Sequence, residues 1–451
     1  MNLIASDNRR IVIGLGKTGL SIARYFSKQG LSFTVADSRD IPPGLDVFRK
    51  EFPGIELILG KFDEKQFLSA TELVISPGIS LAEPAIAAAK ENGVHISGDI
   101  EWFCREANAP IIAITGSNGK STVTTLVGEM AVCSGRKVAV GGNLGVPALD
   151  LLNDENELYV LELSSFQLER CASVGAEVAT VLNVSEDHLD HHGSLLNYHQ
   201  AKHKIFRDCK QVVVNRDDPL STPLIPDDVV RWSFGSGRSD FRAFGIVEQD
   251  GQQYLALARE PLLAVNAMKI TGSHNVNNAL AALAIGSAVG LPIPAMLTAL
   301  CDFTGLKHRC EFIAEIQGVR YFNDSKGTNV GATVSALGGL ADEGKVVLIA
   351  GGVDKGADFS PLMDALESHG RAAIFIGEMA LTLMTMLADR IPNVISETMS
   401  DAVSNACEYA LPGDVVLLSP ACASFDMFDN YEHRGNVYTD AVLALAGGES
   451  V

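Results

Sequence analysis

The chain lacks the positive charge that a nucleic-acid-binding surface requires. Its 451 residues include 35 Lys and Arg against 55 Asp and Glu, which gives a formal net charge of −20. Because non-specific binding to nucleic acid depends on a basic face, we expect no nucleic-acid partner. An acidic chain still binds anionic small molecules where basic residues gather in a local pocket, so that class of ligand stays open.

Paired cysteines and long apolar segments are also missing. None of the eight cysteines stands in a Cys-x-x-Cys pair, which favours reduced thiols that serve in packing. Residues 1–10 are polar and lack the apolar segment of a signal peptide. The longest apolar region, residues 279–300, is interrupted by two glycines and two prolines, which favours a pair of soluble helices over a membrane span. We therefore expect a cytoplasmic protein without membrane insertion.

The first segment carries a glycine pattern between two predicted strands. A strand leads into Gly14-x-Gly16-x-x-Gly19, a helix-like run follows, and a second strand, 33–36, ends at Asp37. Such a βαβ unit is typical of a dinucleotide-binding domain in which the acidic residue contacts a ribose. Taken alone, this pattern favours an NAD-dependent oxidoreductase. A further strand, 73–75, runs into Ser76-Pro77-Gly78, a second turn suited to anions.

Residues 110–122 are the most informative stretch of the chain. An apolar run ends at Gly116-Ser117-Asn118-Gly119, and Lys120, Ser121 and a helix-like segment follow. Glycines let backbone N–H groups turn inward, a helix N-terminus favours anionic oxygens, Lys120 reaches terminal phosphates, and Ser121 can hold Mg²⁺. The sequence therefore predicts an ATP site. The turn is shorter than the common P-loop, which has glycine where this chain has Ile114, and the alternative is a strand-to-helix turn that needs glycine for steric reasons only.

Two groups of potential metal ligands follow the central strands. Glu162 ends the predicted strand 158–161, where a carboxylate can reach Mg²⁺ beside the phosphate loop; the alternative is an ordinary solvent-facing glutamate. Five histidines fall between positions 188 and 203. His188 and His192 are four residues apart, a spacing that zinc sites use. The ATP context instead favours His188 as a single histidine beside Mg²⁺.

Lys202 stands at an unusual place in a predicted helix. The helix-like run 195–206 puts Tyr198, Lys202 and Phe206 on one stripe at intervals of four residues. A lysine held on a buried face loses its charge easily, and a neutral amine reacts with CO₂ to give a carbamate, an oxygen ligand for Mg²⁺. The pattern by itself favours the alternative, in which only the aliphatic stem is buried and the ammonium group reaches water.

Polar clusters also follow the strands of the last segment. Strands are predicted at 346–350, 373–376 and 415–418, and the polar clusters occupy residues 323–329, 351–356 and 419–426. Because the carboxyl ends of parallel strands share one edge of a sheet, we expect these clusters to form a small-molecule pocket, and their lysines indicate an anionic substrate.

Strands and helices alternate along the whole chain, which is long enough for about three domains. We predict an α/β protein of three consecutive domains at residues 1–98, 99–305 and 306–451. The N-terminal domain is expected to be Rossmann-like, the central domain to be a P-loop-type mononucleotide-binding domain, and the C-terminal domain to be Rossmann-like. The phosphate loop that follows the first glycine pattern in the chain argues against an NAD-dependent oxidoreductase. That class of enzyme does not account for Lys120 and its loop.

In order and spacing, these motifs resemble those of the Mur ligases and their folylpolyglutamate synthase relatives. The resemblance runs from end to end of the chain. It rests on residues 14–19, 115–121, 142–143, 162–167, 183–188, 274–275, 308–309, 324–326 and 419–426, with Glu432, Arg434 and Gly435 beyond. The first and last of these motifs resemble the branch of the family that adds D-glutamate. Ser117 and Ser121 stand where relatives often have Thr, and Cys310 stands where an aromatic residue is common.

The resemblance implies ATP-driven amide formation in peptidoglycan precursor synthesis, through an acyl phosphate on the substrate UDP-N-acetylmuramoyl-L-alanine and attack by the amine of D-glutamate. It implies UDP-sugar binding by Leu15, Thr18, Asp37, Ser38, Arg39, Ser76, Pro77 and Gly78, in place of NAD. It implies ATP binding by Gly116, Ser117, Asn118, Gly119, Lys120, Ser121, Thr122, Asn275, Arg309, Asp324 and Lys326. D-Glutamate would contact Thr328, Lys355, Ser424, Phe425 and Tyr431.

The resemblance further implies two Mg²⁺ sites, one held by Ser121 and Glu162 and one by His188 and a Lys202 carbamylated by CO₂, which reverses the interpretation favoured by the helix pattern. Lys120, Asn143, Glu162, His188 and Lys202 would be the catalytic residues. We expect a monomer. The alternatives are another Mur ligase or a folylpolyglutamate synthase-like ligase, and, from other classes, the oxidoreductase or a non-catalytic nucleotide sensor.

Overall fold

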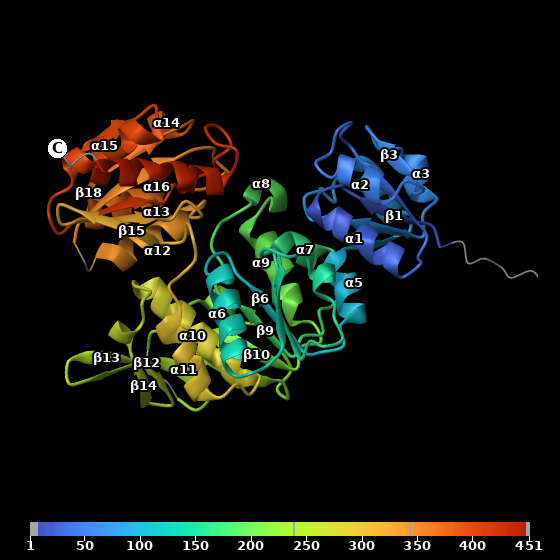
Figure 1. Cartoon of the computed structure of the whole chain (residues 1–451), viewed down its shortest axis with the longest axis horizontal. Helices are drawn as coiled ribbons and strands as arrows, with labels where there is room; N and C mark the ends of the chain where they lie inside the picture. Colours follow the sequence, from blue (N-terminus) through green and yellow to red (C-terminus); the bar gives the residue numbers. More distant parts are fainter. Residues whose placement is uncertain (1–7, 238–239, 342–343, 448–451) are drawn as a thin grey trace, which may run out of the picture.

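The computed structural model describes residues 8–237, 240–341 and 344–447. Figure 1 shows three α/β bodies that follow one another along the chain, from the N-terminal body in blue through the central body in green and yellow to the C-terminal body in orange and red. Each body is built on one sheet with helices on its faces. The predicted fold class is confirmed.

The N-terminal body has a five-stranded, fully parallel sheet in the order β3-β2-β1-β4-β5. Its elements are β1 (Arg10–Ile13), α1 (Lys17–Lys28), β2 (Phe33–Asp37), α2 (Leu45–Glu51), β3 (Leu57–Leu59), α3 (Glu64–Leu68), β4 (Glu72–Ile75), α4 (Pro84–Glu91) and β5 (His95–Ser97). The glycine pattern has a steric cause, because a Cβ atom at Gly19 would lie 1.9 Å from the carbonyl oxygen of Gly14. Helix α1 can therefore pack closely on β1 only with glycine there.

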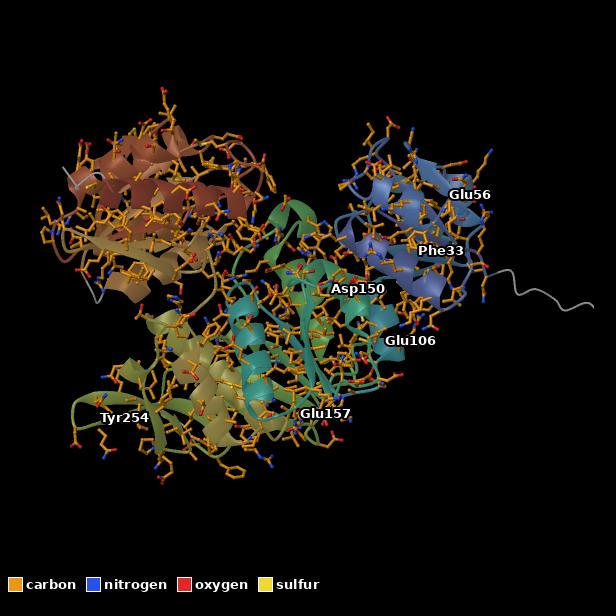
Figure 2. The ribbon with its side chains drawn as sticks, in the orientation of Figure 1. Phe33, Glu56, Glu106, Asp150, Glu157 and Tyr254 are labelled. Carbon is orange, nitrogen blue, oxygen red and sulfur yellow. The ribbon has the colours of Figure 1, made fainter. Side chains whose placement is uncertain are left out.

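Helix α5 (Asp99–Glu106) joins the N-terminal body to the central one. Its Trp102 packs edge-on against Phe26 of α1 with ring centres 4.8 Å apart, and its Phe103 packs against Tyr159 with ring centres 5.0 Å apart. Ser21 of α1 also donates a hydrogen bond of 2.8 Å to Asp150, which Figure 2 labels between the two bodies. One hydrophobic core therefore continues across this boundary.

The central body has a nine-stranded sheet in the order β14-β13-β12-β11-β10-β9-β6-β8-β7. Its strands are β6 (Ile111–Thr115), β7 (Val138–Gly142), β8 (Leu158–Glu162), β9 (Val178–Val181), β10 (Gln211–Asn215), β11 (Val230–Phe234), β12 (Ala243–Gln249), β13 (Gln252–Leu257) and β14 (Glu260–Ala264). Its helices are α6 (Lys120–Cys133), α7 (Ser165–Glu169), α8 (Leu189–His192), α9 (Leu195–His203), α10 (Ser273–Ala288) and α11 (Ile293–Asp302). Short 3₁₀ turns are η1 (Ala148–Leu151), η2 (Lys204–Phe206), η3 (Pro219–Ser221) and η4 (Val265–Ala267).

The sequence analysis missed strands β11 to β14, of which β12, β13 and β14 form an antiparallel extension at the sheet edge. These strands mix apolar with polar residues and leave much of their surface exposed, so their pattern gives little signal. Residues 234–241 are rich in Gly, Ser and Arg, a composition that predicts an exposed turn. This segment begins where β11 ends, and positions 238 and 239 lie outside the described residues. The predicted helix 195–206 is shorter than expected, because it ends as α9 at His203 and continues as the 3₁₀ turn η2.

The predicted apolar helix pair is confirmed as α10 and α11, which a turn containing Gly290 and Pro292 separates. Among the residues that the structure describes, no helix is both long enough and apolar enough to cross a bilayer.

The C-terminal body has a six-stranded sheet in the order β15-β16-β20-β17-β18-β19, parallel except for the edge strand β15. Its elements are β15 (Glu311–Ile316), β16 (Val319–Asn323), α12 (Val330–Leu340), β17 (Val346–Gly351), α13 (Ser360–His369), β18 (Gly370–Ile376), α14 (Ala380–Leu387), β19 (Asn393–Ile395), α15 (Met399–Tyr409), β20 (Val415–Leu418) and α16 (Tyr431–Gly447). The three polar clusters predicted from the sequence follow β16, β17 and β20, which are neighbours in the sheet.

Candidate active site

The phosphate loop connects β6 to α6 at the centre of the nine-stranded sheet. Strand β6 lies between β8 and β9, so the segments that follow all three strands meet at one edge. Gly119 has a φ of 80°, and a Cβ atom there would lie 2.4 Å from Oδ1 of Asn278. Lys120 folds back over the loop and donates hydrogen bonds of 2.8 Å to the carbonyl oxygens of Gly116 and Ser117. The loop is therefore a compact turn whose lysine caps its own carbonyl groups.

Glu162 is the centre of a buried hydrogen-bonded group at the end of β8. Its carboxylate accepts a bond of 2.5 Å from Oγ of Ser121 and one of 2.7 Å from Nδ2 of Asn143. Arg309, which precedes the C-terminal sheet, donates a bond of 2.5 Å to the same Ser121 hydroxyl. Glu162 and Ser121 are each only 2% exposed, which contradicts the alternative of a solvent-facing glutamate.

Lys202 is fully inside the central body. Its side chain is 1% exposed, its Nζ atom donates a bond of 2.8 Å to the carbonyl oxygen of Gly116, and it lies 4.4 Å from the centre of the Tyr198 ring. Burial lowers the pKa of Lys202 well below its ordinary value, and the charge of Lys120 lowers it further. The interpretation that the helix pattern favoured, with the ammonium group in water, is therefore wrong.

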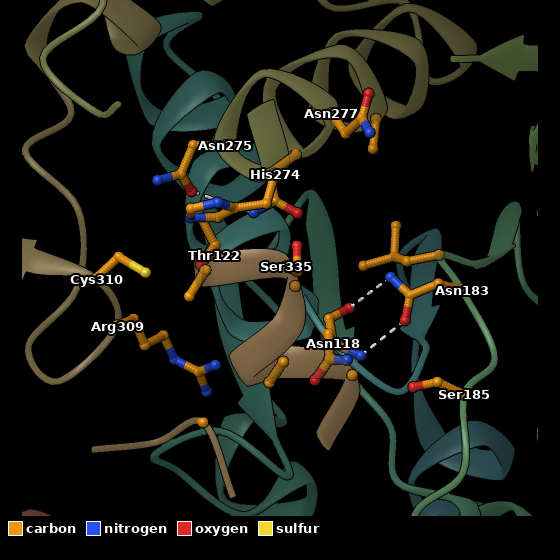
Figure 3. A pocket seen from close by; sticks show the side chains of 18 of the residues that line it. Asn118, Thr122, Asn183, Ser185, His274, Asn275, Asn277, Arg309, Cys310 and Ser335 are labelled. Carbon is orange, nitrogen blue, oxygen red and sulfur yellow. Dashed lines mark hydrogen bonds between the residues drawn. The ribbon is translucent and has the colours of Figure 1, made fainter. Parts of the chain in front are cut away.

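The segment after β9 joins the phosphate loop to the C-terminal body. Asn183 and Asn118 exchange two hydrogen bonds, of 2.8 and 3.1 Å, which Figure 3 shows as dashed lines. Asp187 accepts bonds from Nζ of Lys355 at 3.3 Å and from Nδ2 of Asn329 at 3.2 Å. Burial alone would raise the pKa of Asp187, but the charges of Lys355, His188 and Lys120 together with the hydrogen bond from Lys355 outweigh burial, and the pKa is lowered. The carboxylate is thus a charged link between two bodies.

His188 follows Asp187 in a left-handed conformation with a φ of 54°. Its Nε2 atom lies 3.6 Å from Oδ2 of Asp187, and its ring packs edge-on against Phe166 at 5.0 Å. Burial lowers the pKa of His188 to about 4. The ring is therefore neutral at neutral pH and offers a free nitrogen to a metal ion. His192 points elsewhere, toward Glu169 and Ser165, so the two histidines spaced by four residues do not form a pair.

The C-terminal body contributes buried ionisable groups. Burial raises the pKa of Asp324 to about 7, although its carboxylate accepts a bond of 2.7 Å from Ser419. Burial lowers the pKa of Lys326 to about 8, and its Nζ atom lies 3.9 Å from the centre of the Tyr431 ring. Lys355 also donates a bond of 3.2 Å to Oγ1 of Thr328. Ser424 is buried nearby on the segment after β20, whereas Phe425 is 75% exposed.

A cavity of about 470 Å³ lies between the central and C-terminal bodies. Figure 3 shows Asn118 and Thr122 from one side and Arg309 from the other. The residues predicted to bind ATP that line it are Asn118, Gly119, Thr122, Asn275, Arg309, Asp324 and Lys326. Gly116, Ser117, Lys120 and Ser121 belong to the same loop, and Arg309 ties Ser121 to the cavity wall. The sequence analysis did not assign Asn183, Asp187, Asn278 or Asn329 to the site, although all four stand in polar clusters at strand ends or helix starts.

The N-terminal glycine turn is held by Asp37. This carboxylate accepts the N–H group of Leu15 at 2.7 Å and three bonds from Arg39, at 2.7 to 2.9 Å. Burial would raise the pKa of Asp37, but these bonds from Arg39 outweigh burial and lower it. Thr18 stands in the first turn of α1, Ser38 is exposed after β2, and Ser76 donates a bond of 3.0 Å to Gly14. The predicted UDP-sugar residues therefore gather around one turn.

A second cavity, of about 270 Å³, lies where the N-terminal and central bodies meet. Pro77 and Gly78 line it from one side and Asn143, Phe166 and His191 from the other. Arg170, which is fully buried, donates hydrogen bonds to the carbonyl oxygens of Ile79 and Phe166 and so fixes the two walls together. Arg170 was not predicted as a functional residue, because nothing in the sequence pattern indicates that it lies at a junction between bodies.

Three family models match this chain in series. The Mur ligase MurD-like N-terminal domain matches residues 8–98, the Mur ligase middle domain residues 114–286, and the Mur ligase glutamate ligase domain residues 308–422. The chain belongs to the Mur ligase family. Because this family depends on ATP, the chain is an ATP-dependent ligase, and the NAD-dependent oxidoreductase that the first glycine pattern favoured is ruled out.

Named relatives match almost the whole length of this Mur ligase. It is 56% identical over 448 residues to the UDP-N-acetylmuramoylalanine–D-glutamate ligase of Pseudomonas aeruginosa, an alignment that covers 99% of this chain and 100% of the relative. The enzyme of the same name from Marinobacter nauticus is 51% identical over 446 residues, with the same coverage. The family resemblance predicted from the motifs is confirmed.

Solved structures agree on the fold of this Mur ligase. The UDP-N-acetylmuramate–alanine ligase of Thermotoga maritima matches with a TM-score of 0.62 at 18% identity, over 97% of this chain and 99% of that one. A pseudomurein peptide ligase type C from Methanothermus fervidus matches with a TM-score of 0.60 at 17% identity, over 97% and 100%. At these identities the likeness concerns the arrangement of the three bodies only.

Proposed function

We propose that this Mur ligase joins D-glutamate to UDP-N-acetylmuramoyl-L-alanine in an ATP-dependent amide-forming reaction of peptidoglycan precursor synthesis. The choice of substrates rests on the names of relatives that are 51 to 56% identical over 99% of the chain. The observation that carries the proposal is the hydrogen-bonded group around Glu162. It joins the phosphate loop, through Ser121, to Asn143 on one side and to the C-terminal body, through Arg309, on the other.

We assign one substrate to each of three domains, at residues 1–98, 99–305 and 306–451. The first would hold the nucleotide sugar through Leu15, Thr18, Asp37, Ser38, Arg39, Ser76, Pro77 and Gly78. This assignment is supported by the ordered turn around Asp37 and by the cavity that leads from Pro77 and Gly78 to Asn143. The acceptor would extend along this cavity, so that its alanyl carboxylate arrives beside the phosphate loop.

ATP would occupy the cavity between the second and third domains. The loop from Gly116 to Thr122 would hold its phosphates, with Asn275, Arg309, Asp324 and Lys326 around the rest of the nucleotide. The donor set is suited to an anion, since Lys120, Lys326 and Arg309 supply positive charge around Gly119. Lys120 now caps loop carbonyls and would move to the γ-phosphate when ATP binds.

Two Mg²⁺ ions fit the oxygen and nitrogen donors beside the loop. Ser121 and Glu162 are already in hydrogen-bond contact, a geometry in which hydroxyl and carboxylate can share one ion. His188, neutral by burial, and a carbamylated Lys202 would hold the second. Bound Mg²⁺ would neutralise negative charge that builds up between the carboxylate and the triphosphate.

Carbamylation of Lys202 is supported by its surroundings. A buried amine with a strongly lowered pKa is neutral, and such an amine adds to CO₂, forming a new N–C bond and releasing one proton. The product carries a negative charge near Lys120. Burial lowers the pKa of Lys120, and a neighbouring anion would favour the charged form of its amine. Tyr198 would keep the group oriented, because its ring covers Nζ and its hydroxyl lies 3.2 Å from Oγ of Ser117.

D-Glutamate would bind at the carboxyl edge of the C-terminal sheet, in contact with Thr328, Lys355, Ser424, Phe425 and Tyr431. Lys355 and Thr328 are in contact with one another and with Asp187. A substrate carboxylate would replace Asp187 on these donors or share them with it. The amine of D-glutamate would then face the acceptor carboxylate near Asn143.

The residues present suit a two-step reaction. Lys120 and Lys326 would stabilise the γ-phosphoryl group as the alanyl carboxylate attacks it, giving an acyl phosphate and ADP. Asn143 would orient the reacting carboxylate, since its amide already donates to Glu162 at the end of β8. The amine of D-glutamate attacks the acyl carbon and phosphate leaves. Bringing three substrates together in one gap supplies the remainder of the acceleration.

We further propose that the protein acts as a monomer in the cytoplasm, without nucleic-acid or membrane partners. This is supported by the net charge of −20 and by a substrate set that one chain can bind by itself. Another Mur ligase or a folylpolyglutamate synthase-like ligase would share the loop and the carboxylate chemistry, but the relatives that match 99% of this chain carry the name of the D-glutamate-adding enzyme.

The test is release of phosphate from ATP in the presence of the UDP-sugar–alanine acceptor. We expect release that depends on D-glutamate and not on L-glutamate or L-lysine, with no oxidation of NADH. Release that is indifferent to D-glutamate would refute the assignment of the amino acid, while absence of any acceptor dependence would refute the ligase reaction itself.

A further inference from the structure

Two short helices outside the proposed catalytic group bring one carboxylate and two imidazoles together. Glu169 ends α7, and His191 and His192 end α8. Oε2 of Glu169 lies 3.0 Å from Nε2 of His191, and Oε1 lies 3.3 Å from Nδ1 of His192. One ligand atom from each residue can be chosen so that all three lie within 4.8 Å of one another. Ligands of a tetrahedral zinc ion stand roughly 3.3 Å apart, so the two carboxylate–imidazole distances already suit a shared ion, and small side-chain rotations would bring the two imidazoles into range.

We propose that Glu169, His191 and His192 form a binding site for a transition-metal ion of the zinc class, with water completing the coordination. Imidazole nitrogen and carboxylate oxygen are ligands that zinc, cobalt and nickel share. Mg²⁺ instead prefers oxygen ligands and keeps several waters. The site offers two imidazoles and one carboxylate, whereas the proposed Mg²⁺ sites offer mainly oxygen donors and a single imidazole, that of His188. It does not depend on the ligase reaction.

The ligands are oriented before any ion arrives. The second ring nitrogen of His192, Nε2, lies 3.0 Å from Oγ of Ser165, which leaves Nδ1 facing Glu169. Phe166 packs against both histidine rings, with centres 4.5 Å from His191 and 5.5 Å from His192. A partner on the outer ring nitrogen fixes the orientation of a metal-binding imidazole and raises its basicity.

The carboxylate of Glu169 lies between the two imidazoles and one guanidinium group, those of His191, His192 and Arg170. Arg170 opposes a cation, because its NH1 atom lies 3.6 Å from Oε2 of Glu169. Its guanidinium also interacts with the negative charge of Asp99 and donates to two backbone carbonyls. Because Arg170 has these other partners, the Glu169 carboxylate can also bind a cation.

An ion can reach the site from the cavity between the N-terminal and central bodies. His191 lines this cavity opposite Pro77 and Gly78, and its side chain is 19% exposed, whereas that of His192 is 1% exposed. Once bound, the ion would join α7 to α8. The first helix follows Glu162 and the second follows His188, so the ion would stiffen the segments that carry both residues.

The test measures metal binding to the full-length protein after treatment with a chelator. Zn²⁺ is titrated in competition with a chromophoric chelator, without ATP and with Mg²⁺ in constant excess so that sites specific for Mg²⁺ stay filled. Co²⁺ serves as a second probe through its visible absorption. We expect one Zn²⁺ per chain, and a loss of affinity of about tenfold or more in Glu169→Gln and in His191→Gln. Ser165→Ala should weaken binding less.

Two control variants separate this site from neighbouring imidazoles. His199→Gln alters a second pair, in which the His199 and His203 rings stack at 3.8 Å, and His188→Gln alters the proposed Mg²⁺ ligand. Both should bind Zn²⁺ as the wild type does. Unchanged binding in Glu169→Gln and His191→Gln, or loss in His199→Gln or His188→Gln instead, would overturn the proposal. X-ray absorption at the zinc edge of the wild type gives a readout that needs no variant: two imidazole nitrogens support the site, and an all-oxygen shell overturns it.

Discussion

The Nζ atom of Lys355 lies 3.3 Å from Oδ1 of Asp187, so that one ion pair joins the carboxyl edge of the C-terminal sheet to the segment after β9 of the central sheet. Asp187 is 9% exposed and Lys355 21% exposed at the side chain. A pair so far removed from water holds the two bodies in register. The amine of Lys355 therefore already faces a carboxylate, the group that a bound D-glutamate would present to it under the proposed function.

Lys355→Ala should weaken use of D-glutamate more than use of ATP. Removing one partner of a largely buried, hydrogen-bonded pair costs about 2 kcal/mol or more, so kcat/KM for D-glutamate should fall by roughly thirtyfold or more. Steady-state kinetics with each substrate varied in turn measures the effect. The matched control is Lys345→Ala in the same body, where the amine only makes a long, exposed contact of 3.4 Å. An equal loss for ATP and D-glutamate would contradict the assignment.

Lys120→Ala should abolish ATP turnover. The amine is the cation of the phosphate loop, and removing a group that stabilises charge in the transition state lowers kcat by roughly a hundredfold or more. Phosphate release checks this, and far-UV circular dichroism checks that the variant is folded. Lys137→Ala removes an exposed amine paired with Glu155 and should keep wild-type turnover. Near-normal turnover in Lys120→Ala would mean that the loop does not act on phosphate.

Lys202→Ala should be inactive and should regain part of its activity when short-chain carboxylates are added. A small carboxylate would occupy the volume of the lost side chain and supply the oxygen ligand that the carbamate provides. Activity of the wild type should also fall in CO₂-free buffer and return with bicarbonate. The measurement is phosphate release across a carboxylate titration. Wild-type activity without any carboxylate would end the carbamate proposal.

Arg39→Ala should weaken binding of the nucleotide sugar without changing ATP binding. The guanidinium orders Asp37, which in turn holds the N–H group of Leu15 in the glycine turn. Isothermal titration with each nucleotide separately measures the two affinities. Arg24→Ala, which removes an exposed ion pair with Glu51 on the same body, is the control. A loss confined to ATP would place the nucleotide sugar elsewhere.

The stability of the protein should fall below pH 6.5 in part because of His274. Burial lowers the pKa of His274 to about 4 from an ordinary value of 6.5, and its Nδ1 atom is buried without a hydrogen-bond partner. Between these values the unfolded state binds the proton and the folded state does not. The contribution of neutral His274 to the free energy of unfolding is therefore complete above pH 6.5. It is lost as the pH falls toward 4, by up to about 1.4 kcal/mol per pH unit.

His274→Gln should flatten this part of the pH profile of unfolding free energy, as measured by denaturant titration at several pH values. Asn277→Gln, on the same helix, has no titrating group and should keep the wild-type profile. A profile for His274→Gln that matches the wild type between pH 4 and 6.5 would show that folding does not change the pKa of the histidine.

The local features of the nucleotide sites were predictable because they depend on short stretches of chain. The strand, the glycines and Lys120 are contiguous, so residues 110–122 predicted both the turn and its chemistry. Glu162 was predictable from its place at a strand end, where parallel strands present their carboxyl ends to one edge. The antiparallel strands β12 to β14 were missed because their mixed, half-exposed pattern lacks a clear period.

Whether the amine of Lys202 is buried or reaches water could not be predicted from the helix pattern. A stripe of Tyr198, Lys202 and Phe206 places the lysine on the apolar face, but whether its amine reaches water depends on what covers the end of that face. In the folded protein the phosphate loop covers the end of that face, and the carbonyl oxygen of Gly116 accepts a hydrogen bond from the Lys202 amine. Likewise the spacing of His188 and His192 suggested a pair, yet the left-handed backbone of His188 turns the two rings apart and His192 meets Glu169 instead.

The three α/β bodies, the phosphate loop, the polar strand ends and the family could be predicted from the amino-acid sequence, because each is encoded within segments of a few to some thirty residues. The contacts between side chains and segments that are 91 or more residues apart became visible only in the folded structure: Arg309 with Ser121, Lys355 with Asp187, and Arg170 with the turn after β4. These contacts arise from the packing of whole bodies against one another. The free energy of these contacts depends on how deeply the side chains are buried and on the distance between their atoms. A short segment of sequence determines neither.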